Sequence, residues 1–195
     1  MNFLAHLLLA RSTPESLTGN FAGDFVKGTV KSLEQRIPAP ILEGIRQHRA
    51  IDLFTDAHPT FSRARDLLSP ERRRFAGIVV DIFYDHFLTQ DWPEETRSCS
   101  EFIDYSYKTL FSTKDLVNEL PLPVGRMIDQ DWLGSYSSQE GIALTMRRIV
   151  SRSPKVSPII GAEQDLTRNF EAFEELFASF FPDLLAFNRV WLEEA

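Results

Sequence analysis

The stretch from residue 79 to residue 88 carries three ionisable side chains within an otherwise apolar run, VVDIFYDHFL. Such a run is apolar on nearly every face of a helix, which is typical of a helix buried at the centre of a protein. Asp81 and Asp85 lie four residues apart and share a face, and His86 lies about 100° further round the helix. A buried carboxylate requires an ion pair, several hydrogen bonds or a metal ion. A structural ion pair is one interpretation, but three such residues in one short run favour a metal site.

Length and composition indicate one domain. The chain has 195 residues, of which 43% are hydrophobic and 25% charged, so it can form one substantial core over residues 1–195. Because no pair of alternating strands with a hairpin turn is present, the sequence predicts an all-α, single-domain helical bundle. The net charge of −7 argues against a nucleic-acid-binding protein. No run reaches the roughly 20 apolar residues of a membrane span, and the single Cys99 suits a reducing compartment, which predicts a cytoplasmic protein.

Two segments that precede residues 79–88 in the chain also carry polar residues at inward positions. Residues 19–28, GNFAGDFVKG, have two glycines just before Asp24, which indicates close approach of another helix or of a ligand. In the helix expected from about residue 40 to residue 56, the positions of Ile41, Ile45, His48 and Asp52 share one stripe. His48 and Asp52 can therefore present an imidazole and a carboxylate to one point, although a histidine held by a neighbouring aspartate would also explain this pair.

The chain has no CxxC, GxSxG, P-loop or GxGxxG motif, so its chemistry rests on a dispersed set of imidazoles and carboxylates. This set comprises His6, Asp24, His48, Asp52, Asp81, Asp85 and His86. Mixed imidazole and carboxylate ligands suit Mn²⁺, Mg²⁺, Fe²⁺ or Zn²⁺. An ion held by such ligands can polarise a phosphoryl oxygen and activate a bound water molecule, which predicts metal-assisted hydrolysis of a phosphate ester. Arg49 or Lys27 would then neutralise the charge of the phosphate.

Four segments in order along the chain resemble one family. They are MNFLAHLLLA, GNFAGDFVKG, GIRQHRAID followed two residues later by TD, and DIFYDHFL, and together they resemble the acyl carrier protein phosphodiesterase family. The resemblance implies a helical fold like that of HD-type metal-dependent phosphohydrolases, with the reversed order Asp85-His86 in place of a contiguous His-Asp pair. It further implies hydrolysis of holo acyl carrier protein to the apo protein and 4′-phosphopantetheine, with Mn²⁺ as the preferred metal.

The resemblance also implies which residues form the site. The implied metal ligands are Asp24, His48, Asp52, Asp81, Asp85 and His86. The implied catalytic residues are Asp24, His48, Arg49, Asp85 and His86, of which His86 is one candidate for protonating the serine oxygen that leaves. His6, Lys27 and Asp56 are further candidates.

Two basic stretches are candidates for docking the acidic carrier protein. Residues 63–74 contain five arginines against Asp66 and Glu71, and residues 147–155 contain three arginines and one lysine with no acid. Because both proteins are net negative, a local patch of opposite charge is expected to steer their encounter. The predicted docking residues are Arg63, Arg65, Arg72, Arg73, Arg74, Arg147, Arg148 and Arg152. Solvated helix faces would also explain these arginines.

Towards the C-terminus, Leu166, Phe170, Phe173, Phe177 and Phe180 keep helical spacing, which predicts a core-packing helix ended by Pro182 and followed by a short final helix. Two other functions remain open from the sequence. The first is an HD-like phosphohydrolase acting on a nucleotide or another small phosphoester. The second is a non-enzymatic helical binding module, in which the polar cluster is a buried hydrogen-bond network.

Overall fold

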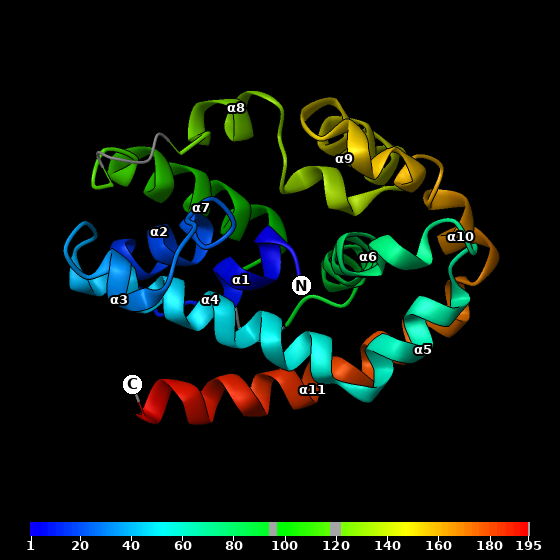
Figure 1. Cartoon of the computed structure of the whole chain (residues 1–195), viewed down its shortest axis with the longest axis horizontal. Coiled ribbons are helices and arrows are strands. Elements are labelled where there is room, and N and C mark those ends of the chain that lie inside the picture. Colours follow the sequence, from blue (N-terminus) through cyan, green and yellow to red (C-terminus); the bar gives the residue numbers. More distant parts are fainter. Residues whose placement is uncertain (94–96, 118–121, 195) are drawn as a thin grey trace.

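The computed structural model describes residues 1–93, 97–117 and 122–194, which form helices and connecting segments without a strand (Figure 1). The prediction of an all-α protein is therefore confirmed. The α-helices are α1 (Phe3–Leu9), α2 (Pro14–Ala22), α3 (Val30–Leu33), α4 (Ala39–Ala57), α5 (Pro59–Leu67), α6 (Ala76–Gln90), α7 (Cys99–Thr113), α8 (Val124–Asp129), α9 (Gln139–Arg152), α10 (Glu163–Arg168) and α11 (Phe170–Glu194). Three 3₁₀ turns join them, η1 (Arg73–Phe75), η2 (Gly134–Ser137) and η3 (Pro154–Ile159).

The apolar helix α6 lies inside the bundle and contacts α1, α5, α9 and α11 (Figure 1). Its aromatic side chains pack against those of α11, with Phe83 in edge contact with Phe173 and Tyr84 in edge contact with Phe177. All four of these rings are almost fully buried. Each buried aromatic side chain contributes on the order of 2 kcal/mol to folding, so the predicted seam of phenylalanines on α11 completes the core around α6.

The helix α11 does not end at Pro182, as the sequence predicts, but continues unbroken from Phe170 to Glu194. Leu184 and Asn188, both after the proline, are buried. The side-chain amide of Asn188 donates to the backbone oxygen of Leu9 and accepts from Gln47. These tertiary contacts offset the backbone hydrogen bond that a proline removes inside a helix.

Helices α2 and α4 cross at two glycines, which allow their backbones to touch. A Cβ atom placed on Gly19 would lie 2.2 Å from the backbone oxygen of Ile41 and 2.8 Å from the Cα of Gly44. The predicted close approach at residue 19 is therefore an approach between helices. This approach allows the side-chain amide of Asn20 on α2 to donate a hydrogen bond of 2.9 Å to Gln47 on α4. Gln47 directly precedes His48.

Among the described residues, no helix combines the length and the apolar character that crossing a membrane requires.

Replacing Gly19 with alanine is expected to destabilise the protein by about 1–3 kcal/mol, because the added methyl group collides with the backbone of α4. Gly77→Ala is the matched control, since a Cβ at Gly77 of α6 meets no atom within 4 Å. There the better helix propensity of alanine should stabilise the protein by up to about 1 kcal/mol. Urea unfolding of both variants tests this, and an equal effect of the two substitutions would contradict the packing at the α2–α4 crossing.

Candidate metal centre

Two imidazoles and one carboxylate converge near the centre of the bundle. His6 on α1, His48 on α4 and Asp52 on α4 each offer a ligand atom, and these three atoms lie within 4.8 Å of one another. The Nε2 atom of His6 lies 3.1 Å from one oxygen of Asp52, and the Nε2 atom of His48 lies 3.2 Å from the other. Asp24, just after α2, lies 3.7 Å from the same atom of His48. The structure therefore brings together four of the residues singled out from the sequence.

The position of His48 depends on Gly23. A Cβ atom at Gly23 would lie 2.3 Å from the imidazole ring of His48, so only glycine leaves room for the ring. The Nδ1 atom of His48 lies 2.8 Å from the backbone oxygen of Asn20. A proton on Nδ1 can be donated to that oxygen, which leaves the lone pair of Nε2 free, the usual arrangement of a histidine that binds a metal.

His6 stacks directly on His48. Their ring centroids are 3.8 Å apart and the ring planes are inclined by 20°. Burial and the adjacent charge of His48 lower the pKa of His6 to about 4, so this imidazole is neutral near pH 7. Its Nε2 atom faces two acceptors, Asp52 and the backbone oxygen of Met1 at 3.1 Å, so without an ion the neutral ring carries its proton on Nε2. An ion bound at Nε2 would require the proton on Nδ1, which is buried without a hydrogen-bond partner among the described residues.

The carboxylates control the protonation of His48. Burial alone would lower the pKa of His48, but Asp24 and Asp52 outweigh this effect and raise it to about 9. Burial opposes the charged form of Asp52 as well, yet the hydrogen bonds from His48 and His6 hold its pKa well below the usual range. Without an ion, the site therefore holds a proton on His48 between two carboxylates, where a cation is favoured electrostatically.

The donor set fits a divalent ion. Two imidazole nitrogens and a carboxylate, with a second carboxylate in reach, suit Mn²⁺, Fe²⁺ or Zn²⁺ and leave coordination positions for water or substrate. Asp24 and Asp52 each have about 40% of the side chain exposed, at 42% and 41% respectively, so the carboxylate side of the group is open. The closed side consists of His6 and His48, which are almost fully buried.

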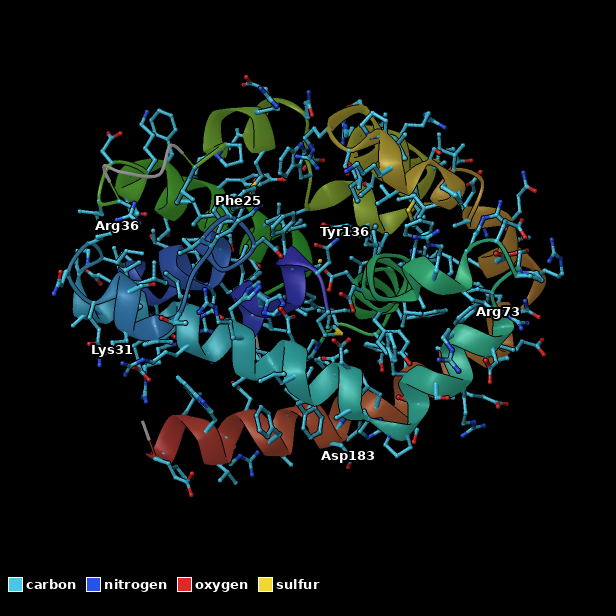
Figure 2. The ribbon with its side chains drawn as sticks, in the orientation of Figure 1. Phe25, Lys31, Arg36, Arg73, Tyr136 and Asp183 are labelled. Carbon is cyan, nitrogen blue, oxygen red and sulfur yellow. The ribbon has the colours of Figure 1, made fainter. Side chains whose placement is uncertain are left out.

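A cavity of about 340 Å³ opens beside Asp24 and Asp52. Its polar lining includes Asp24, Asp52, Asp81, Thr145, Arg148 and Arg152, and its apolar lining includes Phe3, Phe25, Ile78, Trp132, Tyr136 and Ile149. Figure 2 shows Phe25 and Tyr136 on either side of the start of α1, where the cavity lies. It therefore has both charged and apolar surfaces for a substrate.

Asp81 lines this cavity but has a partner of its own. One of its oxygens accepts a hydrogen bond from the amine of Met1 at 2.7 Å. Burial raises the pKa of Asp81 to about 6, despite the opposing effect of that amine. Asp81 therefore lies in the same cavity as Asp52 but does not belong to the cluster of His6, His48 and Asp52.

The sequence assigned Asp85 and His86 to the metal, but the structure engages both elsewhere. Asp85 is fully buried and accepts hydrogen bonds from the backbone nitrogens of Asn2, Leu4 and Ala5 at the start of α1. The Nδ1 atom of His86 lies 2.7 Å from the backbone oxygen of Tyr136. Neither residue belongs to the cluster, because the first turn of α1 covers Asp85 and His86 points towards η2.

The remaining candidates from the sequence lie around the site. Arg49 donates to the backbone oxygen of Val26 at 3.2 Å and so braces the segment that carries Asp24. Lys27 is exposed and lines a second, smaller cavity that shares Phe25 with the first. Asp56 is exposed near the end of α4, one turn beyond Asp52.

The first basic stretch is largely engaged in contacts within the molecule. Arg72 pairs with the buried Asp165 at 3.1 Å, and Arg65 pairs with Asp66 at 3.5 Å. Arg73 donates to two backbone oxygens at 3.0 Å, so its charge is not neutralised. Arg63 and Arg74 are exposed. Figure 2 shows Arg73 at the edge of the molecule, away from Phe25 and Tyr136.

The second basic stretch is divided between two surfaces. Arg148 and Arg152 line the cavity, whereas Arg147 is exposed and does not. The aromatic lining of the cavity, notably Phe3 and Trp132, was not predicted from the sequence. Phe25 directly follows Asp24 and could have been found from that position, but no local pattern indicates that Trp132 faces the same cavity.

Comparison with known proteins gives consistent results. The family model described as "Acyl carrier protein phosphodiesterase" matches residues 1–184. A protein of Photorhabdus laumondii named acyl carrier protein phosphodiesterase is 37% identical, over 95% of this chain and 93% of its own length. Proteins of the same name from Yersinia enterocolitica and Shigella boydii are 32% and 33% identical, each over 95% of this chain and 96% of the relative. No solved structure matches the chain.

The affinity of the site for Mn²⁺ is expected to rise with pH by up to about tenfold per unit between pH 6 and 8. In the metal-free protein His48 keeps its proton up to about pH 9, so binding at its Nε2 atom displaces that proton, whereas His6 is already neutral. Titration calorimetry in two buffers of different ionisation enthalpy should give release of about one proton per ion. An affinity independent of pH over this interval would contradict the coupling.

Asp85→Ala is expected to destabilise the protein by about 3 kcal/mol, because it leaves buried N–H groups of α1 without an acceptor. Asp85→Asn should cost less, since an amide oxygen can still accept. Asp104→Ala, at an exposed position of α7, is the control and should change stability by less than about 0.5 kcal/mol. Urea unfolding measures all three, and a fully stable Asp85→Ala variant would exclude the capping role.

Proposed function

The chain belongs to the acyl carrier protein phosphodiesterase family, and on this basis we propose that it is a hydrolase acting on holo acyl carrier protein. The bond cleaved is the phosphodiester between a serine of the carrier and its 4′-phosphopantetheine arm. The products are apo acyl carrier protein and 4′-phosphopantetheine. This assignment agrees with a cytoplasmic location, where the single cysteine of the chain stays reduced.

The observation that carries the proposal is the cluster of His6, His48 and Asp52 at a cavity with charged and apolar walls. A divalent ion bound there would polarise a phosphoryl oxygen and lower the pKa of a water molecule at the open side. Mn²⁺ is our choice, because carboxylates and water suit this ion while imidazoles are also accepted, and Mg²⁺, Fe²⁺ and Zn²⁺ are the alternatives.

The residues of the chain have distinct proposed roles. His6, His48 and Asp52 hold the ion, and Asp24 either completes its coordination or accepts a hydrogen bond from water on the exposed side of the group. Arg49 acts at a distance, by fixing the segment that carries Asp24. We assign protonation of the serine oxygen to water rather than to His86, because His86 does not line the cavity and its Nδ1 atom faces the backbone oxygen of Tyr136.

The carrier protein requires a basic docking surface outside the cavity. We assign it to Arg73 and Arg74, together with Lys155, because η1, which carries both arginines, contacts η3, which carries Lys155. The bonds of Arg73 to backbone oxygens leave its positive charge available to the acidic carrier. Arg72 is excluded from this role, since its partner is the buried Asp165.

Incubation of the purified protein with holo acyl carrier protein is the first test of this function. With Mn²⁺ we expect the carrier to lose the mass of phosphopantetheine, and with chelator we expect no change. His48→Ala and Asp52→Ala should each lower kcat/KM by at least about 100-fold, because each removes a ligand of the ion. Glu43→Gln, on the exposed side of α4, should retain full activity. Mass spectrometry of the carrier follows the reaction.

If the protein leaves the carrier unchanged but hydrolyses a generic phosphodiester, the metal-dependent hydrolysis would stand and the substrate would instead be a smaller phosphoester. An absence of both activities, with no binding of Mn²⁺, would favour a structural role for the cluster.

A further inference from the structure

One face of helix α9 lines the same cavity as Asp24 and Asp52, the two carboxylates of the candidate metal site. Thr145, Arg148, Ile149 and Arg152 follow the spacing i, i+3, i+4 and i+7, so they share one face of the helix, and all four line the cavity. Figure 1 shows α9 and α4 on opposite sides of α1. The two arginines and the ligands of α4 therefore approach the same cavity from different sides.

Neither cavity arginine forms a salt bridge with any of the residues that the structure describes. An Nη atom of Arg148 donates to the hydroxyl of Ser135 at 3.1 Å. The guanidinium of Arg152 lies 4.7 Å from the centre of the Trp132 ring. Both contacts orient a guanidinium without neutralising it, so two positive charges remain at the cavity.

The charges of these arginines are close enough to influence one another. Burial, together with the nearby positive charges of Arg126 and Arg148, lowers the pKa of Arg152. Clustered cations of this kind repel one another, and an anion placed among them relieves the repulsion. This effect points to a negatively charged ligand.

The segment that contacts both arginines, residues 131–135, is held by hydrogen bonds of its own. Asp131 has a positive φ of 44°, and its carboxylate accepts hydrogen bonds from the hydroxyl of Tyr107 at 2.9 Å and from the nitrogen of Gly134 at 3.1 Å. This turn carries both side chains that contact the arginines. Ser135 accepts a hydrogen bond from Arg148, and the ring of Trp132 lies under Arg152. Arg148 and Arg152 are thus oriented before a ligand binds, which limits the entropy lost on binding.

We propose that Arg148 and Arg152 bind the phosphoryl group of the substrate from the side of the cavity opposite to His6, His48 and Asp52. The proposal rests on the proposed function and adds the residues that hold the scissile group. Asp24, Asp52 and Asp81 line the same cavity and would repel a phosphodiester, so the anion requires positive charge besides that of a bound ion. The planar guanidinium matches the spacing of phosphate oxygens and can donate two hydrogen bonds to them.

Binding of free 4′-phosphopantetheine, measured by calorimetry in the presence of Mn²⁺, separates this role from docking of the carrier protein. We expect Arg148→Ala and Arg152→Ala to weaken its binding by about tenfold or more, since each removes hydrogen bonds to a charged group. Arg147→Ala, on the outer face of α9, should leave this affinity unchanged. Pantetheine, which lacks the phosphate, should bind equally weakly to the wild type and to all three alanine variants.

Kinetics with holo acyl carrier protein complete the test. Arg148→Ala and Arg152→Ala should lower kcat/KM about 10- to 100-fold, and the corresponding lysine variants should recover part of the loss. Arg189→Ala, on the exposed face of α11, is the activity control. Thermal unfolding of each variant separates a loss of binding from a loss of folding.

Two results would overturn the inference without affecting the proposed function. In the first, the alanine variants bind 4′-phosphopantetheine as tightly as the wild type and cleave the carrier normally. In the second, they raise the KM for the carrier but leave the affinity for 4′-phosphopantetheine unchanged, which would show that the arginines contact acidic side chains of the carrier. If the wild type leaves the carrier intact, the proposed function fails, and weaker binding of inorganic phosphate by the two variants would still support the anion site.

Discussion

The buried carboxylate of Asp85 fixes the short helix on which the centre of the molecule depends. Helix α1 has only seven residues, too few to be stable in isolation, and Asp85 accepts three backbone hydrogen bonds near its start. His6 lies about one turn further along and is held against His48 in this way. Asp85 thus supports the candidate metal centre through the backbone of α1, and its removal would release one of the two imidazoles.

The residues of one helix could be predicted as neighbours, whereas the contacts between helices could not. His48 and Asp52 lie four residues apart on α4, and this spacing alone indicated that they share a face. By contrast, the spacing of Asp85 and His86 showed only that they are buried polar groups. A carboxylate that receives N–H groups and one that receives an ion have the same pattern in sequence, so the sequence alone could not separate Asp85 and His86 from members of the cluster such as His6.

The fold class followed from helical periodicity, but a helix end inferred from proline did not. Pro182 removes a single backbone hydrogen bond from α11. The residues beyond it gain burial of Leu184 and a hydrogen-bond network that joins Asn188 to Gln47 and Leu9. The partners of Asn188 lie more than 100 residues away in the chain, so the compensation is absent from any local window of sequence.

The charge of the whole chain is a poor guide to the charge of its ligand. The net charge of −7 suggests that the protein repels an anionic ligand. Around the cavity, however, the fold places carboxylates from α4, α6 and the segment after α2, and arginines from α9. Charges on the outer surface are screened over roughly 8 Å at physiological ionic strength, so the nearest groups dominate inside the cavity. The acidic wall would favour a divalent ion and the basic wall a phosphate, so a phosphodiester bound between them would contact both.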